Sequence, residues 1–300
     1  MALKQIKNKI VATKKTGQVT KAMESVSAVK MRKSQERAFL SRPYVHTALS
    51  ILKQLLNANP KISHELITKT DHENVLVVIV TSDKGLAGSI NSAVLKQAEI
   101  IFRNNNLVDV IAIGRKALEF AQREKKNIIA SYTNISDSVK IEDIYEMSEM
   151  ALNTFKQGEY KSVQVVYQNF VSTFEQNPTV RQVLPVLPEE LEGVMRDIKP
   201  KTGKFSENNF QIDTQVIHKI EPSPEETLDV LLPELVQVMF YHALLESKAS
   251  EHSARMVAMK NATDKSKELV KALTIKFNKQ RQAAITAEVS EITAGVEAMK

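Results

Sequence analysis

The sequence contains no cysteine and no tryptophan among its 300 residues. The lack of cysteine excludes disulfides, thiolate nucleophiles and cysteine-ligated zinc or iron–sulfur sites. Glycine and proline are scarce, at eight and nine residues, and aromatic residues make up only 5%. This composition favours helices and leaves few residues for loops.

Long apolar runs are also missing. No run approaches the 18 or so residues of a membrane-spanning helix, so we expect no such segment. The N-terminus begins with the amphipathic spacing of Leu3, Ile6 and Ile10, not with the apolar core of a signal peptide. Together with the lack of cysteine, these features suit a protein of a reducing cytoplasm.

The net charge of +6 is unevenly distributed. Residues 1–42 carry eleven Lys and Arg against only Glu24 and Glu36, so the rest of the chain is slightly acidic. We therefore expect a basic, partner-facing surface on the first helix. One candidate function is a helical hairpin that binds nucleic acid, with affinity that falls steeply with salt. No aromatic residues interleave with those lysines, which argues against stacking on single strands.

The end of the chain predicts one very long helix. From Leu228 to Phe277 apolar residues recur at alternating spacings of three and four, interrupted by His242, His252, Thr263 and Ser266. A stripe of this length is typical of a helix that packs along a partner helix. If helical throughout, residues 224–299 would extend for roughly 110 Å.

Two prolines mark the base of this helix. Ser223, Pro224 and Glu226 have the spacing of a capping box with proline at the first helical position. Pro233 lies too far inside for that role, and we expect a kink there.

Residues 3–57 also predict helix. The apolar positions are expected at Leu3, Ile6 and Ile10 and then along the stripe Val19, Ala22, Val26 and Val29. Gly17 should weaken the helix locally, and Arg42-Pro43 predicts a bend or a restart.

Between these helices the pattern changes to alternating strands and helices, which predicts βαβ units and a mostly parallel sheet. The expected strands are 75–80, 108–113, 127–130, 162–170 and an edge strand 180–187 that contains Pro185. The expected helices are 90–103, 115–125 and 140–156. The fold class is therefore α/β: a domain at 70–190 inserted into an antiparallel coiled coil of residues 1–57 and 224–300. Residues 191–223 form the connection, with one short strand at 210–220.

Catalytic patterns are not evident. The segment 81–91 follows a strand and precedes a helix, where phosphate-binding loops occur, but it has neither G-x-G-x-x-G nor G-x-x-x-x-G-K-[ST]. We interpret its glycines as serving a tight turn. The six histidines include no HExxH, and His242 and His252 are interpreted as polar residues that fix helix register. We expect no enzymatic activity, cofactor or metal.

Several long motifs resemble the gamma subunits of F-type ATP synthases. They are VTKAMESVSAVKMRKSQ (19–35), SRPY (41–44), TSDKGLAGSIN (81–91), EPSPEE (221–226), ASEHSARMVAMKNATD (249–264) and NKQRQAAITAEVSEITAG (278–295). The resemblance implies a central rotor shaft, one copy per complex, that transmits torque between the membrane c-ring and a hexamer of alpha and beta subunits. It also implies that the inserted domain is Rossmann-like without binding nucleotide.

The resemblance further implies site residues. Those expected to contact the alpha/beta hexamer are Lys21, Met23, Lys30, Arg32, Lys33, Asp83, Lys84, Arg255, Gln282, Thr286 and Glu288. Those expected at the foot, near the epsilon subunit and the c-ring, are Ser41, Arg42, Tyr44 and Glu221. No presequence and no cysteine-bearing insertion are seen, so a bacterial protein at the cytoplasmic face of the inner membrane is expected.

Overall fold

The computed structural model describes residues 2–59, 62–187 and 223–299, and only the backbone at 2, 38–39, 41–46 and 49. Its two long helices are α1 (Ala2–Ala58) and α6 (Pro224–Glu297). The chain forms two compact units: Met1–Ser27 with Arg255–Lys300, called the paired-helix unit, and Ala28–Ala254, called the sheet unit. The expected strand at 210–220 and Glu221 lie outside the described residues.

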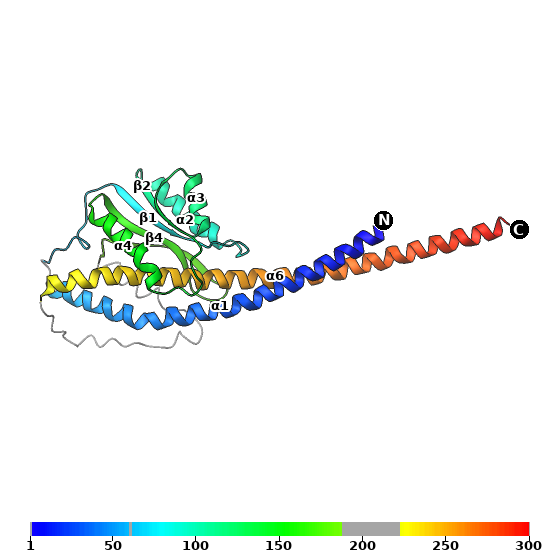
Figure 1. The fold of residues 1–300 in the computed structure, drawn as a ribbon, viewed down its shortest axis with the longest axis horizontal. Coiled ribbons are helices and arrows are strands. Elements are labelled where there is room, and N and C mark those ends of the chain that lie inside the picture. The colour runs from blue at the N-terminus through cyan, green and yellow to red at the C-terminus, as the bar shows by residue number, and fades with distance from the viewer. Residues whose placement is uncertain (1, 60–61, 188–222, 300) are drawn as a thin grey trace. The chain divides into compact units, whose positions relative to one another are not determined.

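The sheet unit contains five strands in the order β3-β2-β1-β4-β5 (Figure 1). They are β1 (Asn74–Val80), β2 (Val108–Ile113), β3 (Asn127–Tyr132), β4 (Tyr160–Phe170) and β5 (Gln176–Leu184). All pairings are parallel except that of the edge strand β5 with β4. Three helices lie between them in the chain, α2 (Ile90–Asn104), α3 (Arg115–Arg123) and α4 (Glu142–Lys156). The predicted α/β class and every predicted strand and helix of this region are confirmed, with bounds that differ by a few residues.

Helices cover both faces of this sheet. On one face, alternate β1 residues such as Val77 and Ile79 pack with buried residues of α2 and α3. On the other face, Leu76 and Val78 pack with α4, with Leu52 of α1 and with Leu235 of α6. The continuous run of β-branched residues in β1 follows from this burial on both sides.

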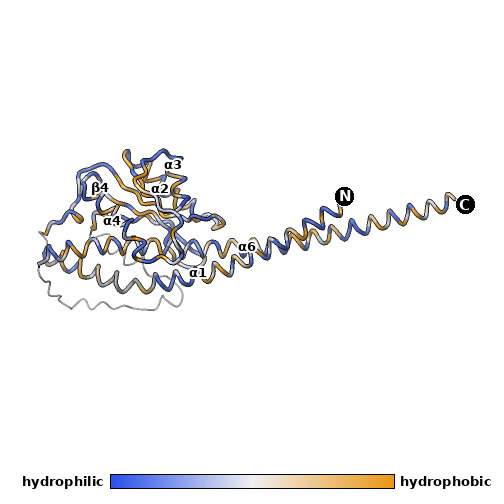
Figure 2. The backbone as a smooth tube through the Cα atoms, viewed as in Figure 1, coloured by the Kyte–Doolittle hydropathy of each residue, from blue (hydrophilic) through white to orange (hydrophobic). Residues whose placement is uncertain are grey.

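The first part of α6 is apolar because it is a core helix. One stretch of α6 is long and apolar enough to cross a membrane by composition, but 61% of it is buried inside the protein. Leu228, Leu232 and Phe240 are fully buried in the larger hydrophobic core. The hydropathy colouring in Figure 2 shows hydrophobic residues along both this stretch and the strands. The burial accounts for the apolar composition, since core helices have the same pattern.

The base of α6 begins as the sequence predicts. The backbone N–H of Glu226 donates to Ser223 Oγ at 3.2 Å, and this hydroxyl lies 3.3 Å from Glu226 Oε1. The helix then continues through Pro233 without interruption, and the kink expected there stays a prediction. Likewise, α1 is one helix from residue 2 to residue 58, so the restart considered at Pro43 does not occur.

In the paired-helix unit the ends of α1 and α6 run antiparallel, as predicted. Thr20 Oγ1 lies 2.8 Å from Thr263 Oγ1, and three residues towards the N-terminus Gly17 faces Ser266. A Cβ at Gly17 would lie only 3.2 Å from Ser266 Cβ, so the two backbones approach closely there. Figure 1 shows α6 continuing past the N-terminus of α1 within this unit.

The predicted apolar stripe on α1 is wrong beyond Ile10. Val19, Val26 and Val29 are 58%, 54% and 58% exposed, and Ala22 is exposed as well. Between residues 11 and 37, the buried positions of α1 are instead small and polar, namely Thr20, Ser27 and Ser34. They continue the three-and-four spacing that starts at Leu3, Ile6 and Ile10. Small residues are preferred in this seam, the line of α1 positions that faces α6, because they let the two helices approach closely. Hydrophobicity alone instead predicts that the valines are buried.

Candidate functional site

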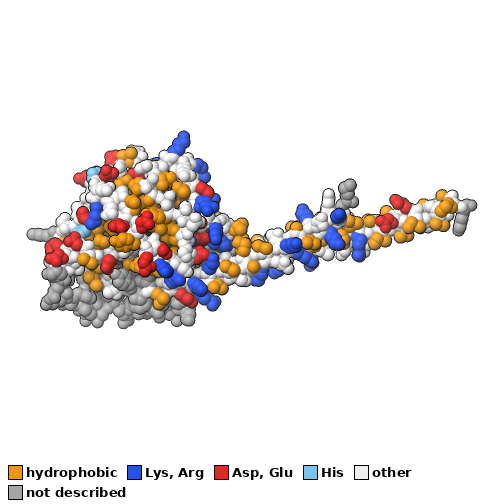
Figure 3. All heavy atoms as spheres, viewed as in Figure 1, with side chains coloured by type: hydrophobic (Ala, Val, Ile, Leu, Met, Phe, Trp, Pro, Cys, Tyr) orange, Lys and Arg blue, Asp and Glu red, His pale blue; other side chains and the backbone are white. Residues whose placement is uncertain are grey.

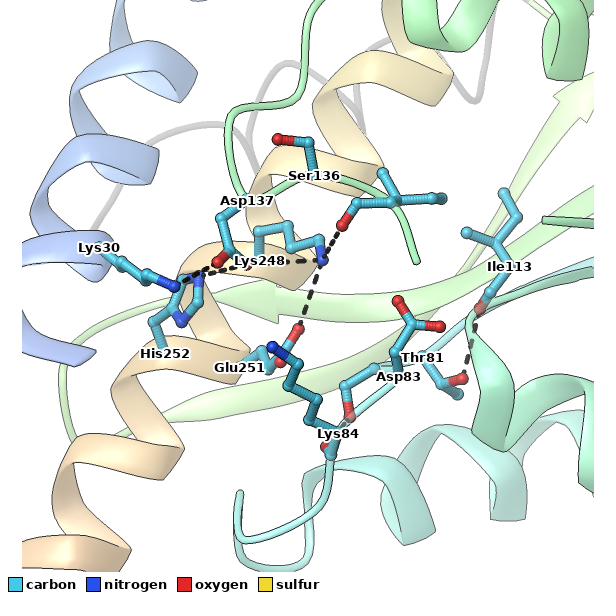
Figure 4. A network of polar contacts seen from close by, with 12 residues as sticks. Lys30, Thr81, Asp83, Lys84, Ile113, Ser136, Asp137, Lys248, Glu251 and His252 are labelled. Carbon is cyan, nitrogen blue, oxygen red and sulfur yellow. Dashed lines mark hydrogen bonds and ion pairs between the residues drawn. The ribbon is translucent and has the colours of Figure 1, made fainter. Parts of the chain in front are cut away.

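One carboxylate in the sheet unit joins the two long helices. Asp137 lies in the loop between β3 and α4, and its Oδ2 accepts a hydrogen bond of 2.5 Å from Lys30 Nζ of α1. Its Oδ1 lies 3.2 Å from His252 Nε2 and 3.8 Å from Lys248 Nζ, both of α6. Figure 4 shows these groups converging on Asp137 from the two helices. We call Asp137 with Lys30, Lys248 and His252 the helix clamp.

The helix clamp holds Asp137 in its charged form. Partial burial alone would raise the pKa of Asp137, but the hydrogen bond from Lys30 and the charges of His252 and Lys248 outweigh it and lower that pKa. On α6, His252 is only 2% exposed and Lys248 is 8% exposed. Lys248 Nζ also donates to the backbone carbonyl of Ile135 and lies 3.8 Å from Glu251 Oε2. Lys248 therefore has both carboxylates and a carbonyl as partners, as a buried charge requires.

A row of polar residues on α6 forms hydrogen bonds with the backbone of β4 and of the turn after it. Ser247 Oγ accepts a hydrogen bond from the backbone N–H of Gln168, and Ser250 Oγ donates to the carbonyl of the same residue. Ser253 Oγ donates to the carbonyl of Thr173 at 2.6 Å. Buried Glu246 accepts from the backbone N–H of Phe170 at 2.9 Å. These residues were not predicted from the sequence, although serines spaced by three lie on one face of a helix.

The segment 81–91 uses its polar groups to cap α3. Asp83 Oδ1 accepts from the backbone N–H of Arg115, and Thr81 Oγ1 accepts from that of Ala117. These N–H groups of the first turn are the ones that would bind a phosphate. Gly114 makes the close approach possible, because a Cβ there would lie 2.2 Å from the Thr81 carbonyl oxygen. The N-terminus of α3 is therefore already occupied by the protein itself, whereas Ser89, the residue before α2, makes no side-chain cap there.

The space beside this loop is small. At the carboxyl ends of β1 and β2, where open α/β sheets bind ligands, Thr81, Asn91, Gln168 and Lys248 help to line a cavity of about 20 Å³. That volume holds about one water molecule, whereas small-molecule pockets measure roughly 300–1,000 Å³. This cavity is therefore far smaller than a typical small-molecule site.

The residues predicted to contact the hexamer lie on α1, in the loop after β1 and on α6. Lys21 is exposed and pairs with Glu24 at 3.0 Å, whereas Lys30 belongs to the helix clamp. Asp83 and Lys84 lie in the capping loop, and Asp83 is engaged there. Three further predicted residues are exposed on α6: Gln282, Thr286 and Glu288.

The remaining predicted residues are less accessible or have no described side chain. Arg255 is buried, at 8% exposure, and Met23 is half-buried, whereas Arg32 and Lys33 are exposed on α1. Ser41, Arg42 and Tyr44 fall on helix positions described by their backbone only. Within the described ranges, no three His, Asp or Glu side chains cluster in a way that could hold a metal ion.

Comparisons with known proteins cover the whole chain. A family model described as ATP synthase matches residues 2–299. The ATP synthase gamma chain of Heliobacterium modesticaldum is 36% identical over 297 residues, which is 99% of each chain. That of Roseiflexus castenholzii is 37% identical over 302 residues, covering 99% of this chain and 98% of the relative.

Solved structures agree in fold. A central stalk and c-ring structure of the Tetrahymena thermophila mitochondrial ATP synthase aligns with a TM-score of 0.60 and 25% identity, covering 81% of this chain and 99% of the other. A rotor structure of the Euglena gracilis mitochondrial ATP synthase aligns with a TM-score of 0.64 over 95% of this chain and 99% of the other, at 17% identity, which supports the fold alone. The family model matches residues 2–299, and relatives above 30% identity align over nearly the full chain. This chain therefore belongs to the ATP synthase gamma chain family.

Proposed function

We propose that this chain is the central rotor shaft of a proton-translocating ATP synthase. It transmits torque between the c-ring and the catalytic hexamer of alpha and beta subunits, and so couples proton flow to ATP synthesis. The chain itself is not catalytic. The observation that carries the proposal is the antiparallel pairing of α1 with α6 through Thr20 and Thr263, in a chain whose relatives are gamma chains along nearly its full length.

The mechanism follows from asymmetry. A single shaft inside a ring of three identical pairs presents a different face to each pair, and so biases each towards a different conformation. To shift one site from 1:99 to 99:1 between two states, the contacts of the shaft must differ by about 5.5 kcal/mol. The paired helices offer such unequal faces, because one side of α1 carries exposed valines and other sides carry lysines.

Within this function we assign the shaft to residues 1–57 and 224–300, the α/β domain to 70–190 and the connection near the foot to 191–223. The proposed hexamer contacts are Lys21, Met23, Lys30, Arg32, Lys33, Asp83, Lys84, Arg255, Gln282, Thr286 and Glu288. The proposed foot contacts, with the epsilon subunit and the c-ring, are Ser41, Arg42, Tyr44 and Glu221.

The exposed apolar end of α6 supports part of this assignment. Beyond the end of α1, Ile285, Val289, Ile292 and Val296 are each more than half exposed. Such a surface fits an apolar sleeve, in which undirected contacts slide with little penalty. Figure 3 shows hydrophobic side chains along this part of α6 and Lys and Arg side chains where the two helices pair.

The complex of which this chain is part is associated with a membrane. We further propose the cytoplasmic face of the bacterial inner membrane as its location, with the chain attached peripherally through its partners. Fractionation of cells before and after a low-salt wash, followed by immunoblotting for the chain, tests this location.

Co-purification tests the function. A tagged chain expressed with its neighbouring subunits should recover alpha and beta in three copies each per shaft, and the isolated chain should not hydrolyse ATP. Recovery of nucleic acid without alpha and beta would instead support the hairpin alternative, which no contact in the described residues favours. ATP hydrolysis by the isolated chain would contradict the non-catalytic assignment.

A further inference from the structure

The order of the strands reverses between β1 and β4. Strands β2 and β3 follow β1 on one side of it, whereas β4 lies on its other side. Open α/β sheets bind ligands beyond the carboxyl ends of the strands at such a switch point. The cavity of about 20 Å³ lies there, lined by Val80 at the end of β1 and by Gln168 near the end of β4. All residues that line it belong to the sheet unit.

The side chain of Gln168 brings a buried acceptor to this cavity. Gln168 is 4% exposed, and its Oε1 has no hydrogen-bond partner among the residues that the structure describes. The backbone of Gln168 is fixed by α6, since its N–H donates to Ser247 Oγ and its carbonyl accepts from Ser250 Oγ. Native proteins rarely leave a buried carbonyl oxygen without a donor, because its lost hydration is not replaced. Gln168 Oε1 therefore requires a donor from within the cavity.

A lysine and a carboxylate of α6 line the same cavity. Lys248 Nζ and Glu251 Oε2 are 3.8 Å apart, which is too long for a direct hydrogen bond. Figure 4 shows the two side chains directed towards one another. Polar groups at such a distance can be joined through a water molecule. Lys248 supplies a donor to this bridge, and Glu251 supplies an acceptor.

The start of α2 supplies a second donor. Ser89 makes no side-chain cap, and Ile90 and Asn91 of the first turn line the cavity. The backbone N–H groups of a first helical turn have no acceptor within their own helix. The side chain of Asn91 is engaged elsewhere, because its Oδ1 accepts from the backbone N–H of Ser82 and its Nδ2 donates to Ser82 Oγ. The donor that α2 offers is therefore a backbone N–H group.

From these groups we propose that the cavity binds a single structural water molecule. The water donates one proton to Gln168 Oε1 and the other to the carboxylate of Glu251, and it accepts from Lys248 Nζ and from a backbone N–H of α2. The volume admits about one water. An anion could not donate to Gln168 Oε1, and a cation would face the ammonium group of Lys248. The water connects α2, β4 and α6, whatever partners the chain has.

A crystal structure of the full chain, at a resolution that shows ordered waters, tests this inference. Density for one water should lie about 2.5–3.0 Å from Gln168 Oε1. A dry cavity would overturn the inference. A peak that scatters anomalously after K⁺ is exchanged for Rb⁺ would also overturn it, because the occupant would then be a monovalent cation.

Variants of Gln168 provide the second measurement. Gln168→Met keeps the length of the side chain but removes the acceptor, so the density should be lost. Gln168→Glu keeps an oxygen acceptor and should retain it. The matched control is Gln164→Met, on the same strand but outside the cavity, which should also retain the water. Retention in Gln168→Met, or loss from the control, would overturn the inference. If Gln168→Met does not fold, the wild-type structure alone decides between a water and a dry cavity.

Discussion

Asp137 Oδ2 and Lys30 Nζ are 2.5 Å apart, although 107 residues separate them in the chain. The bond connects the loop after β3 to α1, and the other oxygen of the same carboxylate faces His252 and Lys248 of α6. A single acidic side chain therefore has partners on both long helices. In a protein that transmits torque, such a residue positions the helices against the sheet.

Replacing Asp137 with Asn should weaken this connection. The change removes a charge that faces Lys248 and His252, both buried, and leaves those groups poorly compensated. We expect a loss of about 2 kcal/mol in the free energy of unfolding, measured by chemical denaturation of the isolated chain. In the assembled complex, the ratio of protons pumped to ATP hydrolysed should fall.

The matched control is Glu268→Gln. Glu268 pairs with Lys265 at 2.7 Å, but both side chains are more than 60% exposed. Its loss should cost less than about 1 kcal/mol. If the two variants lost equal stability, the clamp would be no more than another surface ion pair.

The pH dependence of stability should differ between wild type and Asp137→Asn. The pKa of Asp137 is lowered in the folded protein from its ordinary value of 3.8. A carboxyl whose pKa is lower in the folded state than in the unfolded state stabilises the protein at pH values above its unfolded-state pKa. This stabilisation is lost as the pH falls through the folded-state pKa. The difference in the free energy of unfolding between the two proteins should therefore be constant near neutral pH and should shrink below pH 3.8. Thermal unfolding across an acid series measures this difference, and a difference that widens on acidification would contradict the assignment.

Gly114→Ala should disrupt the sheet unit. Gly114 has φ of +90°, and an added Cβ would lie 2.2 Å from the Thr81 carbonyl oxygen, a backbone atom that cannot move freely. Backbone strain and steric overlap together should cost more than about 3 kcal/mol. Expression level and the midpoint of thermal unfolding report the effect.

Gly158→Ala separates these two contributions. Gly158 also has positive φ, at +78°, but nothing lies within 4 Å of an added Cβ. This variant should show strain alone, at about 1–2 kcal/mol. A loss at Gly158 as large as at Gly114 would show that the contact with Thr81 contributes nothing.

The sheet was predictable from the sequence because its signals are local. Continuous apolar runs rich in β-branched residues, such as residues 75–80, identify buried strands, and helices of about a dozen residues between them imply parallel pairing. The cap at Ser223 was predictable for the same reason, since its partners lie within three residues.

The seam of α1 and the helix clamp were harder to predict. The seam at Thr20 and Ser27 was missed because hydrophobicity favours the neighbouring valines, while the close approach of two backbones favours small residues. The helix clamp depends on Asp137 meeting residues more than 100 positions away, and no spacing in the sequence encodes that contact. Charged residues in a loop are usually solvated, so Asp137 carried no signal of its own.

A disulfide between the helices of the shaft tests whether they turn as one body. The chain has no cysteine, so Thr20→Cys with Thr263→Cys introduces the only thiols. The two hydroxyl oxygens are 2.8 Å apart, so we expect cysteine sulfurs at these positions to come close enough to form a disulfide. Oxidation should produce the cross-link in high yield, seen as altered mobility on a non-reducing gel.

If α1 and α6 rotate together, the oxidised complex should retain the ATP-driven proton pumping of its reduced form. The control pair is Val19→Cys with Thr263→Cys, which should stay reduced because Val19 is 58% exposed and lies off the seam. If cross-linking between residues 20 and 263 stopped pumping in a reversible, thiol-sensitive manner, the helices would have to move against each other during the cycle. In that case the small polar residues of the seam would serve sliding and not only close packing.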